Sequence, residues 1–265
     1  MTEAEQLTRI VEYMKAHWAS PVKPEWQVSL TEYPAIVKRV VADFSAGKTR
    51  EHHFVRIAGL SGSGKTTQLL PATEAYFTAM ELNPILVAAR RFVEYHPHYQ
   101  EILDFYGEAN LRKMTDEFST IMLFLTLSTL IKSGYDIILD VTLLDPAMEE
   151  ILMSLLATGK YNTLLLMIAT SPEVTEKFLA GRAWRHTRET ELEFIRATSL
   201  ALEYYATHHK DMRIILWSVY DEPPIYDGPV STALSTFTKY STITTPATKN
   251  DDARRAAKIR YLTEL

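Results

Sequence analysis

The sequence predicts an α/β fold, in which a parallel sheet carries helices on both faces and a helical extension precedes it. Five short apolar runs predict the strands, and most of them are followed by a helical pattern; they cover residues 53–58, 84–88, 135–140, 162–169 and 212–219. Such alternation is typical of a parallel sheet wrapped by helices. A glycine-rich segment, Gly59 to Thr66, directly follows the first predicted strand.

The segments outside the predicted sheet are mainly helical. Residues 2–17 place Leu7, Ile10, Val11 and Met14 at helical spacing, and the prolines at 21 and 24 then make a short linker. A second helix is expected over residues 30–44, with Ile36, Val37, Val40 and Val41 facing inward. Residues 222–250 read as loop-dominated, and the chain ends in a short charged helix. We therefore expect an N-terminal helical extension over residues 1–26 and one domain over 27–265.

The composition is that of an ordinary globular protein. The chain has 265 residues, 46% of them hydrophobic and 23% charged, with a net charge of −5 and no cysteine. Disulfides, thiolate metal sites and a cysteine nucleophile are therefore excluded. The negative balance gives no support to a nucleic-acid partner. No signal peptide is evident, and the apolar run 121–131 predicts a buried helix, so we expect a cytoplasmic protein without a membrane partner.

The segment "GLSGSGKT" fits the phosphate-binding pattern G-x-x-x-x-G-K-[ST] and lies between a predicted strand and a predicted helix, as that motif requires. Its glycines let backbone N–H groups wrap a polyphosphate, and the helix N-terminus adds partial positive charge. Lys65 is expected against the β- and γ-phosphates, and the Thr66 hydroxyl as a magnesium ligand. The predicted nucleotide-binding residues are Gly59, Ser61, Gly62, Ser63, Gly64, Lys65, Thr66 and Thr67. This P-loop predicts ATP and Mg²⁺ as the bound groups.

Asp140 closes the third predicted strand, in "GYDIILDVT". A carboxylate at the end of a strand beside a phosphate loop is a usual partner for magnesium, so Asp140 is predicted as a catalytic and metal-binding residue. The alternative is that Asp140 caps a helix or a turn. Thr142, two residues further on, is a candidate for contact with the substrate.

Arginines gather after the fourth predicted strand, in "EKFLAGRAWRHTRETELEFIRAT". Guanidinium groups on a helical lid suit the spread negative charge of a phosphoryl group during transfer. The alternative is that these arginines form surface ion pairs with Glu189, Glu191 and Glu193. The arginines in question are Arg182, Arg185, Arg188 and Arg196.

Taken together, these segments resemble the zeta toxins of bacterial toxin–antitoxin systems, which are P-loop kinases of UDP-N-acetylglucosamine. The resemblance runs from about residue 30 to the helix after Arg196, and it includes "GLSGSGKTT", "F-x-x-x-HPHY", "SGYDIILDVT" and "RAT". It implies that Arg182 and Arg196 contact the nucleotide and act in catalysis. It also implies a small-molecule acceptor such as a UDP-sugar, and an antitoxin protein as a candidate partner.

The chain departs from the family pattern where the acceptor should bind. The family pattern is an acid, which is the expected general base, then one residue, then "Phe-Arg-x-x-His-Pro"; here Arg90 stands in place of the acid and Val93 in place of the arginine. A glutamate that holds the sugar in relatives falls near Phe124, and a further arginine falls near Leu144. Arginine cannot accept a proton at neutral pH. The nucleotide half of the site is kept, therefore, while the acceptor half is changed.

Two functions remain open from the sequence. In the first, the protein is an ATP-dependent kinase that phosphorylates a hydroxyl of another small molecule, which contacts Arg90, Glu94, His96 and Thr142. A displaced base need not abolish such a reaction, because phosphoryl transfer depends mainly on positioning and electrostatics. In the second, it is a catalytically impaired ATP-binding protein that acts as a switch. A polynucleotide kinase is a weaker third reading, because the chain is acidic.

Overall fold

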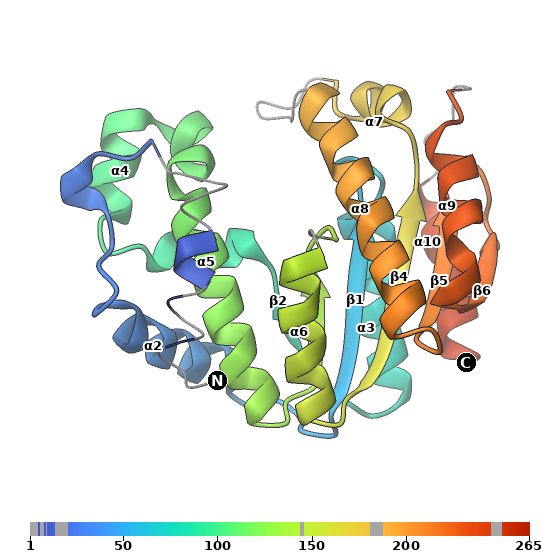
Figure 1. The fold of residues 1–265 in the computed structure, drawn as a ribbon, viewed down its shortest axis with the longest axis horizontal. Coiled ribbons are helices and arrows are strands. Elements are labelled where there is room, and N and C mark those ends of the chain that lie inside the picture. Colours follow the sequence, from blue (N-terminus) through green and yellow to red (C-terminus); the bar gives the residue numbers. More distant parts are fainter. Residues whose placement is uncertain are drawn as a thin grey trace. The chain divides into compact units, whose positions relative to one another are not determined.

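The computed structural model describes residues 5, 8, 10–13, 21–143, 146–180, 188–244 and 251–265 of the chain. The chain forms two compact units (Figure 1). Unit 1 consists of Met1–Lys48 and Val87–Tyr135, and unit 2 of Thr49–Leu86 and Asp136–Leu265. The chain therefore passes between the units three times. The predicted division at residue 26 is not tested by this arrangement and stays a prediction.

A six-stranded sheet in the order β2-β3-β1-β4-β5-β6 forms the centre of unit 2. β1 pairs in parallel with β3 and β4, and β4 pairs in parallel with β5, while β6 runs antiparallel to β5. The sequence prediction therefore holds for the main part of the sheet. The strands are β1 (His53–Gly59), β2 (Ile85–Val87), β3 (Ile137–Asp140), β4 (Asn162–Ala169), β5 (Arg213–Ser218) and β6 (Tyr226–Pro229).

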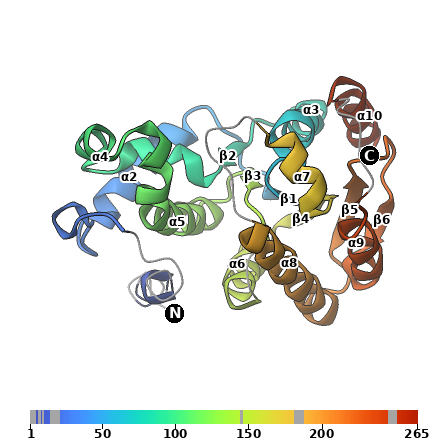
Figure 2. The same cartoon turned by 90° about the horizontal axis from the view of Figure 1, so that it is seen from above.

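Helices cover both faces of this sheet, as predicted. Figure 2 shows α3 and α10 on one side of the strands and α6, α8 and α9 on the other. Their alternation with the strands follows from the right-handed crossovers that parallel pairing requires. The bounds are α3 (Leu70–Ala79), α6 (Pro146–Thr158), α7 (Pro172–Phe178), α8 (Arg188–His208), α9 (Ala233–Ser241) and α10 (Asp251–Thr263).

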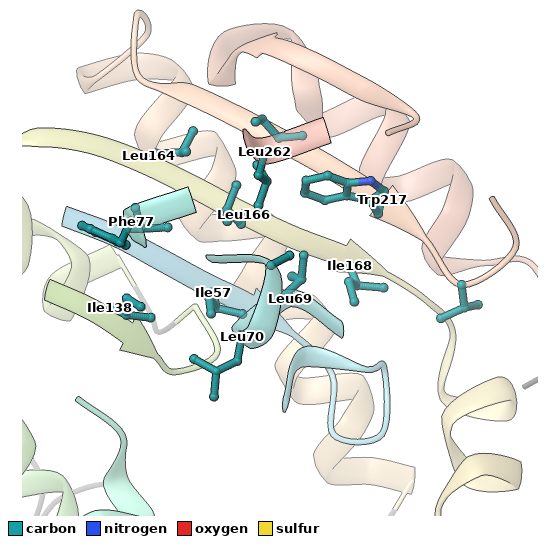
Figure 3. Packing of buried hydrophobic residues seen from close by; sticks show 14 of the residues in the cluster. Ile57, Leu69, Leu70, Phe77, Ile138, Leu164, Leu166, Ile168, Trp217 and Leu262 are labelled. Carbon is teal, nitrogen blue, oxygen red and sulfur yellow. The ribbon is translucent and has the colours of Figure 1, made fainter. Parts of the chain in front are cut away.

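The core of unit 2 is built from strand residues and from the first turns after the phosphate loop. Ile57, Leu166 and Trp217 are fully buried in three neighbouring strands, and they pack with Leu69 and Leu262 (Figure 3). Leu69 belongs to the segment that leads from the loop into α3, so the loop is fixed to the core on one side. The burial of such side chains contributes about 1.5–3 kcal/mol each.

Unit 1 is helical. It contains η1 (Pro24–Trp26), α2 (Tyr33–Ser45), two short 3₁₀ helices η3 (Ala89–Arg91) and η4 (Val93–Tyr95), α4 (Tyr99–Tyr106) and α5 (Glu108–Lys132). α2 buries Tyr33, Ile36, Val40 and Phe44, while Val37 and Val41 are half-buried. The described residues of the segment 2–17 are helical, and Ile10 and Val11 among them are buried. Leu7 and Met14 lie outside the described residues.

α5 contains the apolar run predicted to form a buried helix, and Ile121, Leu127 and Ile131 are indeed buried. By length and hydropathy alone it could cross a membrane, since its most apolar 18-residue window has a mean hydropathy of 1.2. However, 67% of that window is buried by the rest of the protein, and a core helix passes the same test. We therefore describe α5 as the central helix of unit 1.

Three elements fall in the region predicted to be loop-dominated: β6, the 3₁₀ helix η5 (Val230–Thr232) and α9. β6 reads Tyr-Asp-Gly-Pro, which has no strand-forming pattern, and it forms by pairing with the edge of β5. Asp227 of β6 accepts two hydrogen bonds from Arg213 of β5, at 2.8 and 2.7 Å, and one from Tyr261 of α10 at 2.5 Å. The helices η5 and α9 follow directly. Tertiary contacts of this kind override weak local propensity.

Candidate functional site

The phosphate loop connects β1 to a helix whose first turn is a π-helix, Lys65–Leu69. Glycine is required at both ends of the loop for steric reasons. Gly59 has a φ of +135°, and a Cβ there would lie 2.8 Å from the carbonyl oxygen of Ile168 in β4. Gly64 has a φ of +102°, and a Cβ there would meet the amide of Gln68 at 2.7 Å. Only glycine accepts these conformations without strain.

Lys65 bends back over its own loop in this structure. Its Nζ donates hydrogen bonds to the carbonyl oxygens of Gly59, at 2.7 Å, and Leu60, at 2.9 Å. The ammonium group is therefore held at the loop, where a polyphosphate would replace carbonyl oxygens as its acceptor. Ser63 is 2% exposed, and among the described residues its hydroxyl has no hydrogen-bond partner. Ser61 and Gly62 are half-buried, and Thr66 and Thr67 are exposed.

The segment after β3 is attached to the same loop. Thr142 donates from its hydroxyl to the Gly59 carbonyl oxygen at 3.3 Å, so this oxygen accepts from both Thr142 and Lys65. From β1, Arg56 donates to the carbonyl oxygens of Thr142, at 2.8 Å, and Val141, at 3.4 Å. The residues that follow Asp140 are thus fixed to β1 and to the start of the phosphate loop.

Asp140 is 7% exposed and pairs in register with Ile57 of β1, which is two residues before the loop begins. Thr66 lies at the other end of the loop. Among the described residues no group of three or more His, Cys, Asp or Glu gathers to hold a metal. This donor set fits Mg²⁺, which is commonly held by one or two protein oxygens while waters and substrate phosphates complete its octahedron. The binding of such an ion by Asp140 and Thr66 stays a prediction.

A buried ionic cluster supports this side of the loop. The guanidinium of Arg56 bonds to the carboxylate of Glu149 in α6 and, at 3.3 Å, to the hydroxyl of Tyr205 in α8, and Tyr205 also donates to Glu149. Burial, and next the charge of Glu149, raises the pKa of Tyr205, so its hydroxyl remains a donor. The cluster joins α6 and α8 to the strand that precedes the loop. The sequence analysis did not identify it, since only the isolated charge in an apolar strand, Arg56, hints at it.

The structure describes two of the four arginines predicted to lie on a helical lid, Arg188 and Arg196. Arg196 lies exposed on α8, free of the core, and its role in catalysis stays a prediction. Arg188 forms a surface ion pair with Glu173 of α7, which is not one of the predicted partners Glu189, Glu191 and Glu193. Arg182 and Arg185 lie outside the described residues. Their predicted contacts with the nucleotide therefore also stay predictions.

Glu191 is buried, whereas the sequence analysis offered it as a partner in surface ion pairs. This glutamate of α8 is 1% exposed, and neither carboxylate oxygen has a hydrogen-bond partner among the described residues. Burial raises the pKa of Glu191 to about 7; the charge of Lys65 opposes the rise, and that of Glu176 adds to it. Helical spacing could have indicated this burial, because Glu191 shares the buried face of α8 with Thr198, Leu202 and Tyr205.

The paired arginines after β2 belong to unit 1. Arg91 places its guanidinium 4.1 Å from the centre of the Phe44 ring, and burial lowers its pKa. Arg90 and Glu94 are exposed. One arginine of the pair thus packs on an aromatic ring of α2, whereas Arg90 presents its charge at the surface of the unit. Contact of Arg90 and Glu94 with an acceptor stays a prediction.

His96 is a structural residue of unit 1. It is 5% exposed, its ring centre lies 4.5 Å from that of Phe118, and its Nδ1 accepts a hydrogen bond of 3.1 Å from the backbone N–H of His98. Burial, and next the charge of His98, lowers the pKa of His96 to about 4, so the ring is neutral at pH 7. The segment "HPHY" forms a turn that leads into α4. A contact between His96 and substrate stays a prediction.

Two further departures from the family pattern serve the packing of unit 1. Val93 packs against the buried cluster of Val22, Ile102 and Leu111. Phe124 of α5 is 3% exposed. Apolar side chains thus occupy positions where relatives were expected to carry an arginine and a glutamate. Leu144 lies outside the described residues.

A phosphate loop between a central parallel strand and a helix, with an acid at the end of the neighbouring strand, defines a P-loop α/β protein of the kinase type. The sequence matches the zeta toxin family over residues 42–216. The chain therefore belongs to the zeta toxin family. Membership in this family implies a nucleotide site at the phosphate loop.

Solved structures agree with this fold. A structure from the PezAT chromosomal toxin–antitoxin system of Streptococcus pneumoniae is similar, with a TM-score of 0.65 and 19% identity, over 91% of this chain and 99% of that chain. The AvrRxo1-ORF1:AvrRxo1-ORF2 complex with sulphate ions is also similar, with a TM-score of 0.50 and 11% identity, over 88% of this chain and 85% of that chain. No curated protein matches the chain.

Proposed function

We propose that the protein is an ATP-dependent kinase that transfers the γ-phosphoryl group of ATP to a hydroxyl of a small, nucleotide-sugar-like acceptor. The observation that carries this proposal is the complete phosphate loop, with Lys65 at its N-terminal helix turn and Asp140 on the adjacent strand, in a zeta toxin family member. Family membership supports the reaction type, and Lys65, Thr66 and Asp140 are the residues that we propose for the nucleotide and its metal ion.

In the proposed reaction Lys65 exchanges the carbonyl oxygens of Gly59 and Leu60 for oxygens of the β- and γ-phosphates. Thr66 and Asp140 would hold Mg²⁺, and a bound ion would neutralise part of the negative charge of the phosphates. Arg182 and Arg196 act on the charge that develops on the transferring group. Each guanidinium can donate two parallel hydrogen bonds to phosphate oxygens, which suits this role.

The acceptor differs from that of the relatives that phosphorylate UDP-N-acetylglucosamine. Arg90 stands in place of an acid, and Val93 and Phe124 are apolar and packed. A group that approaches Arg90 is therefore anionic or a strong hydrogen-bond acceptor. UDP-N-acetylglucosamine is consequently a poor substrate. By analogy with the toxin–antitoxin system of the similar S. pneumoniae structure, a small antitoxin protein is a candidate partner in the cytoplasm.

The test is phosphoryl transfer itself. The purified protein is incubated with γ-labelled ATP, magnesium and a panel of UDP-sugars and nucleotides, and labelled products are separated. We expect a labelled acceptor other than UDP-N-acetylglucosamine, and no product with the Lys65→Ala variant. Efficient labelling of UDP-N-acetylglucosamine would contradict the altered acceptor site. Tight ATP binding without transfer to any acceptor or to water would favour the nucleotide-binding switch instead.

The acceptor site can be probed by restoring an acid with Arg90→Asp. We expect this change to reduce the native reaction, because it replaces the positive charge that the acceptor meets. It should not create efficient phosphorylation of UDP-N-acetylglucosamine, since Val93 and Phe124 remain apolar. Exposed Arg260 of α10 provides a control for the same change of charge, and Arg260→Asp should retain the native rate. An Arg90→Asp variant at the native rate would remove Arg90 from the acceptor site.

A further inference from the structure

The two carbonyl oxygens that hold Lys65 at the phosphate loop each have a second hydrogen-bond donor. The Gly59 oxygen accepts from Lys65 Nζ at 2.7 Å and from the Thr142 hydroxyl at 3.3 Å. The Leu60 oxygen accepts from Lys65 Nζ at 2.9 Å and from the backbone N–H of Ser63 at 3.2 Å. Gly59 and Leu60 are both buried. One second donor thus belongs to the loop itself, and the other, Thr142, belongs to the segment after β3.

The second donors matter because Lys65 has to leave both oxygens before it can bind the β- and γ-phosphates of a nucleotide. A buried carbonyl group that loses its donor costs free energy. When Lys65 turns to the phosphates, the Leu60 oxygen keeps the N–H of Ser63, and the Gly59 oxygen keeps the hydroxyl of Thr142. Neither carbonyl group is then left without a donor, so the movement of Lys65 costs less than it would from carbonyl groups that it alone satisfied.

Thr142 is held in place by the protein, independently of any nucleotide. Arg56 of β1 is 3% exposed, and its guanidinium donates to the carbonyl oxygens of Thr142, at 2.8 Å, and Val141, at 3.4 Å. Hydrogen bonds from a charged donor are stronger than those between neutral groups. β3 also pairs in parallel with β1, and Thr142 follows β3 by two residues. The backbone of Thr142 is therefore fixed beside the start of the phosphate loop before a nucleotide arrives.

We propose that Thr142 is a positioning residue for Lys65: its hydroxyl remains on the Gly59 carbonyl oxygen while Lys65 moves from the loop to the phosphates. This role rests on the proposed function, because it requires a nucleotide at the phosphate loop. Thr142 acts through Lys65 and needs no contact with the reacting atoms. A contact of Thr142 with the acceptor is a separate role and stays a prediction.

Two variants separate the hydroxyl from the size of the side chain. Thr142→Val has nearly the same shape but no donor, so in its nucleotide complex the Gly59 oxygen loses both Lys65 and the hydroxyl. We expect this variant to bind ATP about 5–100-fold more weakly, which is the cost of an unsatisfied buried carbonyl expressed as affinity. Thr142→Ser retains the hydroxyl and should recover most of the affinity. In both variants kcat should change little, because the ATP that does bind engages Lys65 as in the wild type.

The experiment uses the full-length protein with ATP and Mg²⁺, and calorimetric titration without an acceptor gives the affinity. Phosphoryl transfer to the panel of UDP-sugars and nucleotides, and to water, gives kcat and the KM for ATP. Thr158→Val is the matched control, because the exposed Thr158 of α6 also donates to a backbone carbonyl oxygen, that of Ser154, at 2.9 Å. It loses the same kind of hydrogen bond at the C-terminal end of α6, and it should bind ATP as the wild type does.

A second measurement concerns the nucleotide-free protein. Lys65→Ala and Thr142→Val each remove one of these two donors from the Gly59 oxygen, whereas the double variant removes both. Urea unfolding should therefore show a loss of stability in the double variant that is greater than the sum of the two single losses. Additive losses would show that the two groups do not support each other at this oxygen, and they would overturn the inference.

The outcomes separate this inference from the proposed function. If the wild type binds ATP and transfers phosphate, and Thr142→Val binds ATP equally well, Thr142 does not position Lys65, whereas the kinase function stands. A weakened Thr142→Val that Thr142→Ser does not improve on would also overturn the inference, because the hydroxyl would not be the cause.

If the wild type binds ATP but transfers phosphate neither to an acceptor nor to water, the kinase function fails, and the ATP affinities still decide the role of Thr142. If the wild type binds no ATP, both fail. If Thr142→Val does not fold, Thr142→Ala, which also lacks the hydroxyl, replaces it in each measurement, and wild-type ATP affinity in that variant overturns the inference.

Discussion

Lys65 interacts with its own loop through two carbonyl oxygens, and these contacts are dispensable for folding because β1 and Leu69 already fix the loop. The Lys65→Ala change should therefore abolish ATP binding or turnover while the urea midpoint shifts little. Titration of labelled ATP and urea unfolding measure the two effects. Exposed Lys210→Ala, which removes the same charge from the end of α8, should change neither. Unaltered ATP affinity and activity in Lys65→Ala would exclude the loop as the nucleotide site.

The neutral state of His96 predicts an acid sensitivity of unit 1. The folded-state pKa of about 4 lies below the unfolded value of about 6.5, so the unfolded chain binds the proton first as the pH falls. Stability that is present above pH 6.5 is therefore lost progressively towards pH 4. His96→Asn keeps an acceptor for the His98 N–H and does not titrate. Urea unfolding at pH 7 and pH 4.5 should show a smaller difference for this variant than for the wild type; an equal difference would contradict this account.

Glu191 makes stability depend on pH in the opposite direction. Its carboxyl ionises at about 7 in the folded protein, but at about 4.3 in an unfolded chain. The unfolded state therefore loses its proton first, and stability falls as the pH rises from about 4 to 7. The Glu191→Gln variant should consequently gain stability relative to wild type at pH 8 and show no such gain at pH 4. A thermal melt at both pH values checks this, and a gain of equal size at both would show that charge is not the cause.

At the scale of elements, the buried cluster of Arg56, Glu149 and Tyr205 ties β1, α6 and α8 together. Removal of one charge leaves the other uncompensated, so Glu149→Ala should cost about 3–5 kcal/mol in the free energy of unfolding. Tyr205→Phe removes only a hydroxyl and should cost less. The double change Arg56→Met with Glu149→Leu should recover most of the loss in a urea titration, because no unpaired charge remains. A double variant as unstable as Glu149→Ala would show that unpaired charge is not the cause.

The same double variant has a second expected effect. Without Arg56, the carbonyl oxygens of Val141 and Thr142 lose their donor, and the segment after Asp140 loses its attachment to β1. A stable protein with weakened nucleotide turnover is therefore expected. Stability and turnover that recover together would show that the cluster does not position this segment.

Elements with strong local patterns could be predicted from the sequence, and those that depend on distant contacts could not. Five strands and the phosphate loop follow from apolar runs and from glycine spacing. β6 could not be predicted, since a Tyr-Asp-Gly-Pro strand exists only through the edge of β5 and the side chain of Arg213. Among site residues, Lys65 and Asp140 occur in recognisable motifs. The burial of Glu191 depends on the packing of α8, and its helical spacing from Thr198, Leu202 and Tyr205 is the one signal of it in the sequence.

At the scale of the whole molecule, the three passages of the chain between the units converge on Asp136. Its buried carboxylate accepts hydrogen bonds from the backbone N–H groups of Glu51, at 3.2 Å, and His53, at 2.9 Å. Its backbone bonds to Thr49 and Ile85, at 3.0 and 2.8 Å. One residue, Asp136, thus joins the two chain segments of unit 2, Thr49–Leu86 and Asp136–Leu265.

Replacement of this carboxylate tests the connection. Asp136→Ala leaves two part-buried N–H groups without acceptors, and each is expected to cost at most about 1–3 kcal/mol. Limited proteolysis should then cut near residues 48–51 and 134–136 well before other sites. Asp104→Ala, an exposed change in α4, serves as the control. Unchanged proteolysis of Asp136→Ala would show that the passages are fixed by other contacts.

The strand order also determines when the phosphate loop is completed during synthesis of the protein. β1 is made early, yet both of its neighbours, β3 and β4, come from later parts of the chain. Gly59, at the start of the phosphate loop, pairs with Ile168 of β4 and lies close to its carbonyl oxygen. The loop therefore lacks this contact until Ile168 has left the ribosome. Long-range pairing of this kind also forms slowly. A nascent chain therefore carries the nucleotide motif without its supporting sheet, and the ribosome must pass Ile168 before the surroundings of the phosphate loop can be completed.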